Sequence, residues 1–418
     1  MSETPEERYD EKAAKAALAA KLDAADELAG LRDRFVLDTA SDHAGGAAGV
    51  YLDGNSLGAL PCAVPGRVED VVRRQWGELR IRSWDESGWW TAPERIGDRI
   101  APLVGAAPGQ IVVGDSTSVN VFKALVAAVR MAGESGSSPR DEIVVDASTF
   151  PTDGYIAESA ARMTGCRLIP VLPADVPGVL GPRTAAVLLN HVDYRTGRLH
   201  DLPGLTAAVH AAGALAVWDL CHSAGALPVE LDAGAVDLAV GCTYKYLNGG
   251  PGSPAYLYVR RELQPRFDSP LPGWTSHAEP FGMRPEYEAG AGVVRGRVGT
   301  PDILSMLALE AALEVWEGVS VKAVRAKSLA LTDFFLECVD AYVPQGLVES
   351  VTPSAHAERG SQVALRCARA GDVMRQLIER GVIGDYRAPD ILRFGFTPLY
   401  VGFADVERAA RVLGEVLG

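Results

Sequence analysis

The sequence has few cysteines, and no CxxC motif among them. The six are Cys62, Cys166, Cys221, Cys242, Cys338 and Cys367. The seven histidines are equally dispersed, and the only adjacent pair of the two residue types is Cys221 with His222. A disulfide framework and a zinc module both need ligands at close, regular spacing. We therefore expect a reduced protein without a bound metal.

Long apolar runs and an excess of basic residues are also missing. No run reaches the roughly 18 apolar residues of a membrane span, and residues 1–35 are acidic and helical in pattern, without the apolar stretch of a signal peptide. The formal net charge of −14 argues against nucleic acid or an anionic membrane as a partner, because both attract a basic surface. These absences predict a cytoplasmic protein that binds a small molecule.

The composition, 48% hydrophobic and 22% charged, is typical of a globular protein, and 418 residues are too many for one simple core. Short apolar runs alternate with helical patterns from about Ile111 to Val259. Such runs, rich in Val, Leu and Ile, are buried on both faces, so we predict an α/β fold with a doubly wound, mostly parallel sheet. The predicted strands are residues 110–115, 141–147, 166–171, 185–192, 214–220, 237–241 and 255–259.

The pattern changes after the Gly- and Pro-rich segment 296–302. Long helices are predicted from residue 303 onwards, followed by a small sheet and a closing helix, which together indicate a smaller α+β domain. The strands of this sheet are predicted at 361–367, 381–387 and 390–396, and the helix at 404–417. We expect three parts: an N-terminal helical segment over 1–50 that packs on the small domain, a large domain over 51–302, and the small C-terminal domain over 303–418.

Ser116, Thr117 and Ser118 follow the first predicted strand directly and open a helix. Free backbone N–H groups, hydroxyls and the helix dipole together suit a phosphate group. Ordinary N-capping is the alternative explanation of the same residues. Neither GxGxxG nor GxxxxGK[ST] occurs in the sequence, which argues against a dinucleotide or a triphosphate as the ligand.

Two further strand ends carry charged residues. Asp219 lies at the end of one predicted strand. An aspartate in that position usually caps backbone N–H groups, unless it binds a cationic group of a ligand. Lys245 follows another strand in an apolar, glycine-rich context, where loss of solvation favours a nucleophilic amine; the alternative is a lysine that reaches the surface. The helix start at residues 116–118, which we call the phosphate cup, lies after one strand, and an aspartate and a lysine lie at the ends of others. This combination suits pyridoxal 5′-phosphate. Asp219 would pair with its pyridine nitrogen, and Lys245 would form a Schiff base with its aldehyde.

Blocks of sequence in the same order make the chain similar to a known family. They are "YLDGNSLGALP" (51–61), "GDSTSVNVFKAL" (114–125), "FPTDGYIAES" (150–159), "WDLCHSAGALPVEL" (218–231), "CTYKYLNGGPG" (242–252), "PGWTSH" (272–277), "RVGTPDILSM" (297–306) and "LRFGFTPLY" (392–400). Together they resemble kynureninase, a fold-type-I pyridoxal-phosphate-dependent hydrolase. The resemblance implies hydrolysis of L-kynurenine or 3-hydroxy-L-kynurenine to anthranilate or 3-hydroxyanthranilate plus L-alanine. It also implies a homodimer with its sites at the subunit interface.

The resemblance assigns roles around the cofactor. Lys245 would carry the cofactor and take the α proton, Asp219 and His222 would flank the ring, and Tyr244 would bind phosphate and relay a proton. The remaining cofactor contacts would be Thr117, Ser118, Trp274 and Thr300 at the phosphate, the last two across a dimer interface, with Phe150 stacked on the ring, Asp153 near its phenolic oxygen, and Asn190 close by.

Arg393 in "ILRFGF" would form a bidentate pair with the substrate α-carboxylate, which its planar fork suits. Asn55 and Ser56 of "DGNSLG" would lie near the substrate. Each residue also has a structural explanation: Phe150 and Trp274 as core or rim aromatics, His222 as a cap, Arg393 as a surface ion-pair partner, and "DGNSLG" as a turn. The cluster Trp84, Trp89 and Trp90 would either pack an anthraniloyl ring or anchor the N-terminal segment.

Two other classes of function are compatible with the motifs. One is another fold-type-I activity, a class-V aminotransferase or a cysteine desulfurase. A desulfurase needs a reactive cysteine on a mobile loop, but Cys338 lies in a helical pattern and Cys367 in a strand-like one. The other is a non-catalytic ligand-binding relative, which the presence of Lys245 and Asp219 disfavours. The sequence leaves open which of the two kynurenines is preferred, and whether the pathway is tryptophan catabolism or specialised metabolism.

Overall fold

The computed structural model describes residues 5–37, 49–134 and 139–418, and the chain divides into two compact units. Unit 1 comprises Met1–Ala63, Arg195–Arg198 and Glu314–Gly418, and unit 2 comprises Val64–Tyr194 and Leu199–Leu313. Residues 38–48 of the segment predicted for 1–50 lie outside the described residues. The predicted domain bounds, 51–302 and 303–418, stay a prediction.

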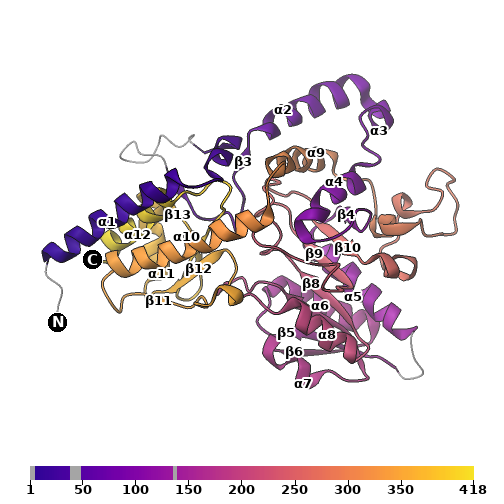
Figure 1. The fold of residues 1–418 in the computed structure, drawn as a ribbon. Helices are drawn as coiled ribbons and strands as arrows, with labels where there is room; N and C mark the ends of the chain where they lie inside the picture. The colour runs from indigo at the N-terminus through magenta and orange to yellow at the C-terminus, as the bar shows by residue number, and fades with distance from the viewer. Residues whose placement is uncertain (1–4, 38–48, 135–138) are drawn as a thin grey trace. The chain divides into compact units, whose positions relative to one another are not determined.

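A seven-stranded sheet forms the centre of unit 2 (Figure 1). Its strands are β4 (Ile111–Val113), β5 (Glu142–Asp146), β6 (Arg167–Val171), β7 (Thr184–Asn190), β8 (Leu215–Asp219), β9 (Leu238–Gly241) and β10 (Tyr256–Val259). Their order is β4-β10-β9-β8-β7-β5-β6, and only β10 runs antiparallel to its neighbours. Each of the seven predicted strands is present, so the predicted α/β fold with a mostly parallel sheet is confirmed.

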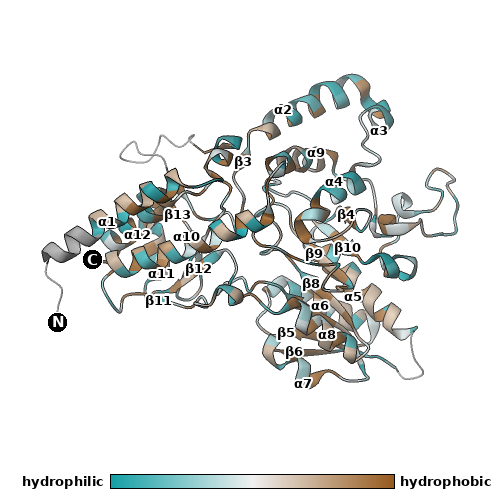
Figure 2. Ribbon diagram, viewed as in Figure 1, coloured by the Kyte–Doolittle hydropathy of each residue, from teal (hydrophilic) through white to brown (hydrophobic). Residues whose placement is uncertain are grey.

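Helices cover both faces of this sheet. On one face, α5 (Thr117–Gly133) and α6 (Pro151–Thr164) pack against each other and share a core with Val217 and Val240. On the other, α8 (Leu202–Ala211) lies over β8, where the indole N–H of Trp218 donates to the Thr206 hydroxyl at 3.0 Å. Val217 and Trp218, which are neighbours in β8, therefore point to opposite faces of the sheet. Both are apolar because helices cover both faces. Figure 2 shows hydrophobic residues along the strands of this sheet.

The remaining helices of unit 2 flank the sheet or precede it. They are α2 (Ala63–Asp70), a π-helix over Val71–Leu79, α3 (Ser83–Glu86), α4 (Ala92–Ile100), α7 (Val176–Val179) and α9 (Ile303–Ala312). Helix α4 packs on β4. The Asp302 carboxylate caps α9 by accepting a hydrogen bond from the backbone N–H of Ser305 at 3.4 Å.

Unit 1 contains the four-stranded antiparallel sheet β11-β12-β15-β14 and two small two-stranded pairings, β1 with β3 and β2 with β13. The strands are β1 (Phe35–Val36), β2 (Val50–Tyr51), β3 (Leu60–Pro61), β11 (Glu349–Ser350), β12 (Gln362–Arg366), β13 (Val382–Ile383), β14 (Asp385–Arg387) and β15 (Ile391–Gly395). The helices are α1 (Pro5–Ala24), α10 (Val321–Tyr342), α11 (Ala370–Glu379) and α12 (Phe403–Leu417). The closing helix and the predicted strands at 361–367 and 390–396 are confirmed as α12, β12 and β15. The predicted strand at 381–387 is wrong as a single strand, because it divides into β13, which pairs with β2, and β14, which joins the four-stranded sheet.

Helix α1 packs against α10 and α12 within unit 1. The Tyr342 hydroxyl joins the three helices, because it donates to Glu407 Oε1 at 2.5 Å and lies 3.0 Å from the carbonyl of Lys12. Across the described residues, we find no helix that combines the length and the apolar character needed to cross a membrane. The same residues hold no group of three or more His, Cys, Asp or Glu arranged to bind a metal ion.

Candidate active site

The N-terminus of α5 lies directly after β4, at the edge of the sheet in unit 2. Asp115 has a left-handed backbone, with φ of 56°, and this sharp turn redirects the chain from strand to helix. The Ser116 hydroxyl then caps the helix by accepting from the backbone N–H of Val119 at 3.4 Å. The N-capping explanation therefore holds for Ser116, and it leaves the hydroxyls of Thr117 and Ser118 for other partners.

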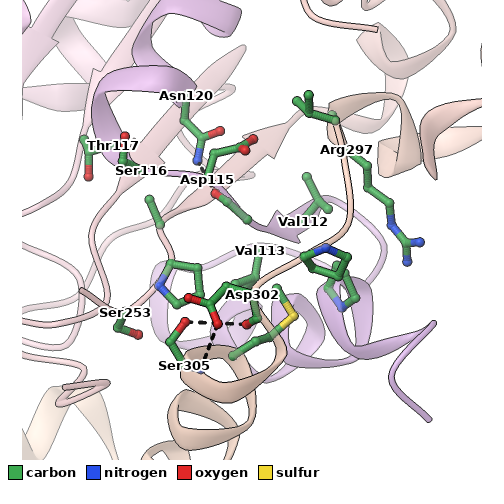
Figure 3. A pocket seen from close by; sticks show the side chains of 18 of the residues that line it. Val112, Val113, Asp115, Ser116, Thr117, Asn120, Ser253, Arg297, Asp302 and Ser305 are labelled. Atoms are coloured by element: carbon green, nitrogen blue, oxygen red, sulfur yellow. Dashed lines mark hydrogen bonds between the residues drawn. The ribbon is translucent and has the colours of Figure 1, made fainter. Parts of the chain in front are cut away.

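A cavity of about 510 Å³ opens beside this helix end (Figure 3). Four of the predicted phosphate residues line it, namely Thr117, Ser118, Tyr244 and Thr300. Figure 3 shows Ser116 and Thr117 on one side of the cavity and Asp302 with Ser305 on another. Backbone N–H groups at a helix start, hydroxyls and a phenol are the donors that bind a phosphate.

Lys123 also lines the cavity, and the sequence offered no sign of its role. Its side chain is buried, and its ammonium donates to Asp115 Oδ2 at 2.6 Å and to the carbonyl of Gly296 at 2.8 Å. Burial lowers the pKa of Lys123, and the Asp115 carboxylate opposes that shift. Lys123 thus joins the turn before α5 to the segment that leads to Thr300.

Three polar side chains meet at the carboxyl ends of the central strands. Asn190 and Asp219 end β7 and β8 and are direct partners in the register. The Asn190 amide donates to Asp219 Oδ2 at 2.8 Å and to Asp153 Oδ2 at 3.2 Å. All three are buried, with 6% of Asn190, 6% of Asp219 and 3% of Asp153 exposed. The structure therefore brings together the two carboxylates that the family resemblance placed at the cofactor ring.

The two carboxylates share a small, water-poor space. Burial raises the pKa of Asp153 well above its ordinary value, and the nearby charge of Asp219 raises it further. The pair therefore favours a proton or a cationic group in this space, and a protonated ring nitrogen beside Asn190 would be such a group.

Lys245 lies in the loop between β9 and β10, half-buried, with its ammonium 3.0 Å from His222 Nε2. Cys221, which precedes His222, connects the acid pair with the phosphate cup. The backbone N–H of Cys221 donates to Asp219 Oδ1 at 2.8 Å, and the Cys221 thiol lies 3.8 Å from the Thr117 hydroxyl. Contacts within unit 2 thus link the acid pair to the cup.

Tyr244 lines the cavity and precedes the lysine, whose ammonium lies 5.9 Å from the centre of the Tyr244 ring. The neighbouring Cys242 side chain, whose charged form would repel a phenolate, raises the pKa of Tyr244, and burial adds to this. The phenol therefore keeps its proton at neutral pH and can donate it. Cys242 is buried, and its backbone N–H donates to the Cys221 thiol at 3.2 Å.

The predicted aromatic residues have different surroundings. Phe150 precedes α6, is 41% exposed, and makes an edge-to-face contact with Tyr194 at 5.2 Å. Trp274 is 39% exposed and packs on Trp90 at 5.5 Å and on Phe281 at 6.0 Å. Trp274 thus belongs to an aromatic cluster of unit 2.

The tryptophans of residues 84–90 have different surroundings, and the two roles that the sequence left open for them stay predictions. Trp89 is buried and its indole N–H donates to the Gln75 side chain at 2.6 Å, which fixes the preceding π-helix. Trp84 packs edge-on against Trp89 and Trp90. Trp90 contacts the exposed Phe281 and lies under the Arg297 guanidinium at 5.5 Å. Only Trp90 thus reaches the exposed cluster.

In unit 1, the loop "DGNSLG" surrounds Arg393. The Arg393 Nη2 group donates to Asp385 Oδ2 at 2.5 Å and to the Ser56 hydroxyl at 2.8 Å. With its amide oxygen toward the guanidinium, Asn55 accepts from Arg393 Nε at 3.2 Å and donates to Asp53 Oδ1 at 3.2 Å. The three predicted substrate residues Arg393, Asn55 and Ser56 therefore lie together.

Two glycines make this close approach possible. A Cβ at Gly395 would meet the Asn55 amide oxygen at 2.0 Å, and a Cβ at Gly54 would meet the Thr397 hydroxyl at 2.1 Å. The backbone N–H of Gly395 donates to the carbonyl of Leu52 at 2.7 Å, which ties the loop to β15. "DGNSLG" is therefore a turn, as its composition suggests, and it also delivers Asn55 and Ser56 to Arg393.

Asp53 gives the loop a pH dependence. Burial raises its pKa to about 6, with Asp385 adding to the shift and Ser56, Arg393 and Arg387 opposing it. Because the folded-state pKa lies above the ordinary value of 3.8, Asp53 stabilises the fold fully below about pH 4. That stability is lost as the pH rises to about 6, at a total cost of up to about 3 kcal/mol.

Asp53→Asn should remove this dependence, since an amide keeps the shape and cannot ionise. Urea unfolding of both proteins from pH 4 to pH 8 measures the effect. We expect the variant to gain stability over the wild type between pH 4 and pH 6, with a constant difference above. A difference that does not change with pH would contradict the shifted pKa.

The residues of unit 2 fit a cofactor with three distinct ends. The cup at α5 offers donors for an anionic group, the acid pair offers a carboxylate for a basic ring nitrogen, and Lys245 offers an amine for an aldehyde. Pyridoxal 5′-phosphate has these three features.

Comparisons with known proteins agree with this chemistry. Residues 324–413 match the family model described as the kynureninase C-terminal domain. The chain is 47% identical over 401 residues to a protein named kynureninase from Burkholderia pseudomallei (strain K96243), covering 95% of this chain and 94% of that protein. A kynureninase from Pseudomonas fluorescens is 46% identical over 400 residues, with the same coverage.

Solved structures show the same fold at lower identity. The cysteine desulfurase CsdA from Escherichia coli superposes with a TM-score of 0.77 at 20% identity, covering 94% of this chain and 98% of that one. A C-DES variant with glycine covalently linked to the PLP cofactor gives a TM-score of 0.73 at 19% identity, with coverages of 88% and 97%. At such identities the likeness concerns the fold alone, and it confirms the predicted fold class.

Proposed function

The chain belongs to the kynureninase family, and on that premise we propose that it hydrolyses L-kynurenine, 3-hydroxy-L-kynurenine or both, with pyridoxal 5′-phosphate as cofactor. The products are anthranilate or 3-hydroxyanthranilate and L-alanine. One observation carries the proposal: a lysine amine, a buried acid pair and a helix-end cup occur together in unit 2 of a chain 47% identical to named kynureninases.

The residues of unit 2 would hold the cofactor by its three ends. Thr117, Ser118 and Tyr244 bind the phosphate, and Asp219 keeps the ring nitrogen protonated. His222 and Asn190 flank the ring, and Phe150 stacks on it. When bound, the cofactor supplies an electron sink for the charge that develops at the substrate α carbon.

Lys245 and Tyr244 handle the protons. Lys245 lies beside His222 and would hold the cofactor through its amine, and as a general base the same amine would take the α proton of the substrate. Tyr244 retains its proton at neutral pH and donates it to the β carbon when the bond between the β and γ carbons breaks. Water adds to the γ carbonyl, so the carboxylate of anthranilate receives the water oxygen and alanine receives the protons.

Arg393 would bind the substrate α-carboxylate through its guanidinium, and Asn55 and Ser56 shape the surroundings of that group. Arginine suits this task because its planar fork matches the two oxygens of a carboxylate. The segment after the lysine supplies Thr300 to the cavity and Trp274 to the exposed aromatic cluster.

A cysteine desulfurase is the second candidate, because the structural neighbours include that activity. The chain lacks support for it within the described residues: Cys338 is buried in α10, and Cys367 is buried at the end of β12. The exposed Cys62 adjoins β3 in unit 1. The identity to named kynureninases therefore decides between the two.

The chain would act as a homodimer with its sites at the interface. Exposed aromatic and apolar side chains of unit 2 support this, since Trp274 is 39%, Phe281 71% and Met283 76% exposed. Clustered apolar groups at a surface commonly mark a protein contact. A cytoplasmic location stays a prediction of the sequence.

A paired assay tests the function. Purified protein loaded with pyridoxal 5′-phosphate is given L-kynurenine or 3-hydroxy-L-kynurenine, and anthranilate, 3-hydroxyanthranilate and alanine are quantified. We expect both products in equal amounts from at least one substrate, with kcat/KM in the usual enzyme range of about 10⁴ M⁻¹s⁻¹ or more. The ratio of the two kcat/KM values gives the preference for the ring hydroxyl.

The same protein incubated with L-cysteine is the control for the second candidate. Release of sulfide and alanine from cysteine, without anthranilate from either kynurenine, would overturn the proposal in favour of a desulfurase.

A further inference from the structure

Arg393 has a guanidinium that is already engaged. The residue is 1% exposed, and its Nη2 group donates two hydrogen bonds, one to Asp385 and one to Ser56. An Nη group carries two hydrogens, so both hydrogens of Nη2 are in use. This matters for recognition, because each of the two paired edges of a guanidinium includes Nη2.

A bidentate carboxylate therefore cannot bind Arg393 beside both existing partners. One edge of the guanidinium consists of Nε and Nη2, and Asn55 also faces Nε at 3.2 Å. The other edge consists of Nη1 and Nη2. Either edge requires that Asp385 or Ser56 give up its hydrogen from Nη2. The charged partner, Asp385, is the chemical equivalent of a substrate carboxylate.

Asp385 can release Arg393 and still keep a cationic partner, Arg387. A single oxygen, Oδ2, receives Arg393 at 2.5 Å, Arg387 at 2.6 Å and the Ser56 hydroxyl at 3.1 Å. Asp385 and Arg393 face each other across β14 and β15, and Arg387 lies two residues further along β14. If Arg393 turned away, Asp385 would keep Arg387 and Ser56.

We propose that Asp385 is an internal carboxylate that occupies Arg393 until the substrate α-carboxylate replaces it, so that Asp385 and Arg387 set the affinity for amino-acid substrates. The inference rests on the proposed role of Arg393 in binding that carboxylate. Asp385 then acts as a competitor for the guanidinium, and Arg387 draws Asp385 away from it. The two residues affect the affinity in opposite directions.

The test compares Asp385→Asn and Arg387→Gln with the wild-type holoenzyme. Asp385→Asn removes the competing charge, so we expect the KM for kynurenine to fall about 5- to 20-fold while kcat changes less than about 2-fold. Arg387→Gln removes the cation that competes with Arg393 for Asp385, so KM should rise by about the same factor. Calorimetric binding of L-alanine, which carries the same carboxylate, should follow both shifts.

Two controls separate this exchange from a general change of charge or structure. Asp390→Asn removes an equal charge from the partly exposed Asp390, which pairs with Arg366, and should leave KM within about 2-fold. Kynuramine, which is kynurenine without its carboxylate, should bind all variants with the affinity it has for the wild type.

The outcomes are distinct. A rise in KM with Asp385→Asn, as expected of a residue that only orients Arg393, overturns the inference. Equal gains for kynuramine and L-alanine also overturn it. If Asp385→Asn does not fold, an unchanged KM in Arg387→Gln is sufficient to reject it. Wild-type turnover of kynurenine tests the proposed function separately, since the inference concerns only ratios between variants.

Discussion

Lys245→Ala is expected to abolish the hydrolysis of kynurenine, with kcat lower by at least about 10³-fold. The variant removes the amine that would hold the cofactor and the base that takes the α proton. The loop that carries the lysine should keep its shape, because Thr243 bonds Ser253 and Pro254 independently of the side chain at 245. Steady-state assays with kynurenine measure the loss, and circular dichroism checks the fold.

Borohydride reduction of the loaded wild type identifies the attachment lysine directly. We expect the mass of the reduced cofactor on the peptide that contains Lys245. Lys123 is the natural control, because it lines the cavity at the cup but holds Asp115 and the carbonyl of Gly296. Label on Lys123, or full activity of Lys245→Ala, would refute the assignment.

Asp219→Asn is expected to lower kcat by about 10²- to 10³-fold while the protein still binds the cofactor. A neutral amide retains the hydrogen bond with Asn190 but cannot stabilise a protonated ring nitrogen, so the electron sink weakens. Turnover of kynurenine measures the effect, and a titration with pyridoxal 5′-phosphate shows that the cofactor is still held.

Asp153→Asn is the matched control for this variant. Asp153 is buried beside Asp219, and burial raises the pKa of Asp153 well above its ordinary value, which favours the neutral form. An amide resembles that neutral form, so we expect a loss of kcat of less than about 10-fold. Equal losses in the two variants would contradict the assignment of the negative charge to Asp219.

The strands of unit 2 could be predicted because each is a short apolar run that differs clearly from the helical segments around it. The positions of Thr117 and Lys245 shortly after strands could be predicted in the same way, while their roles at a cofactor stay predictions. The apolar runs that predict these strands also end near Asn190 and Asp219. The parallel pairing of β7 and β8 places Asn190 beside Asp219, which the sequence pattern does not show. The Asn190 amide then connects Asp219 with Asp153.

Other features depend on contacts between distant segments, and no local pattern announces them. Lys123 looks like an ordinary polar residue of an apolar helix until the fold brings Gly296 to its ammonium. Asp385 and Arg393 are separated by a loop, and their opposition follows from the pairing of β14 with β15. Trp274 was assigned by resemblance, whereas its surroundings, Trp90 and Phe281, come from segments far along the chain.

The antiparallel strand β10 has a consequence for the lysine loop. Because β9 and β10 are hydrogen-bonded neighbours, residues 242–255 form a closed excursion between them. The backbone N–H of Asn248 donates to the carbonyl of Lys245 at 2.9 Å, that of Gly249 donates to Thr243 at 2.9 Å, and Asn248 adopts a left-handed backbone with φ of 56°. Backbone hydrogen bonds within the loop therefore hold the segment that carries the Lys245 amine. The protein without its cofactor thus already has this loop in a fixed shape to receive pyridoxal 5′-phosphate.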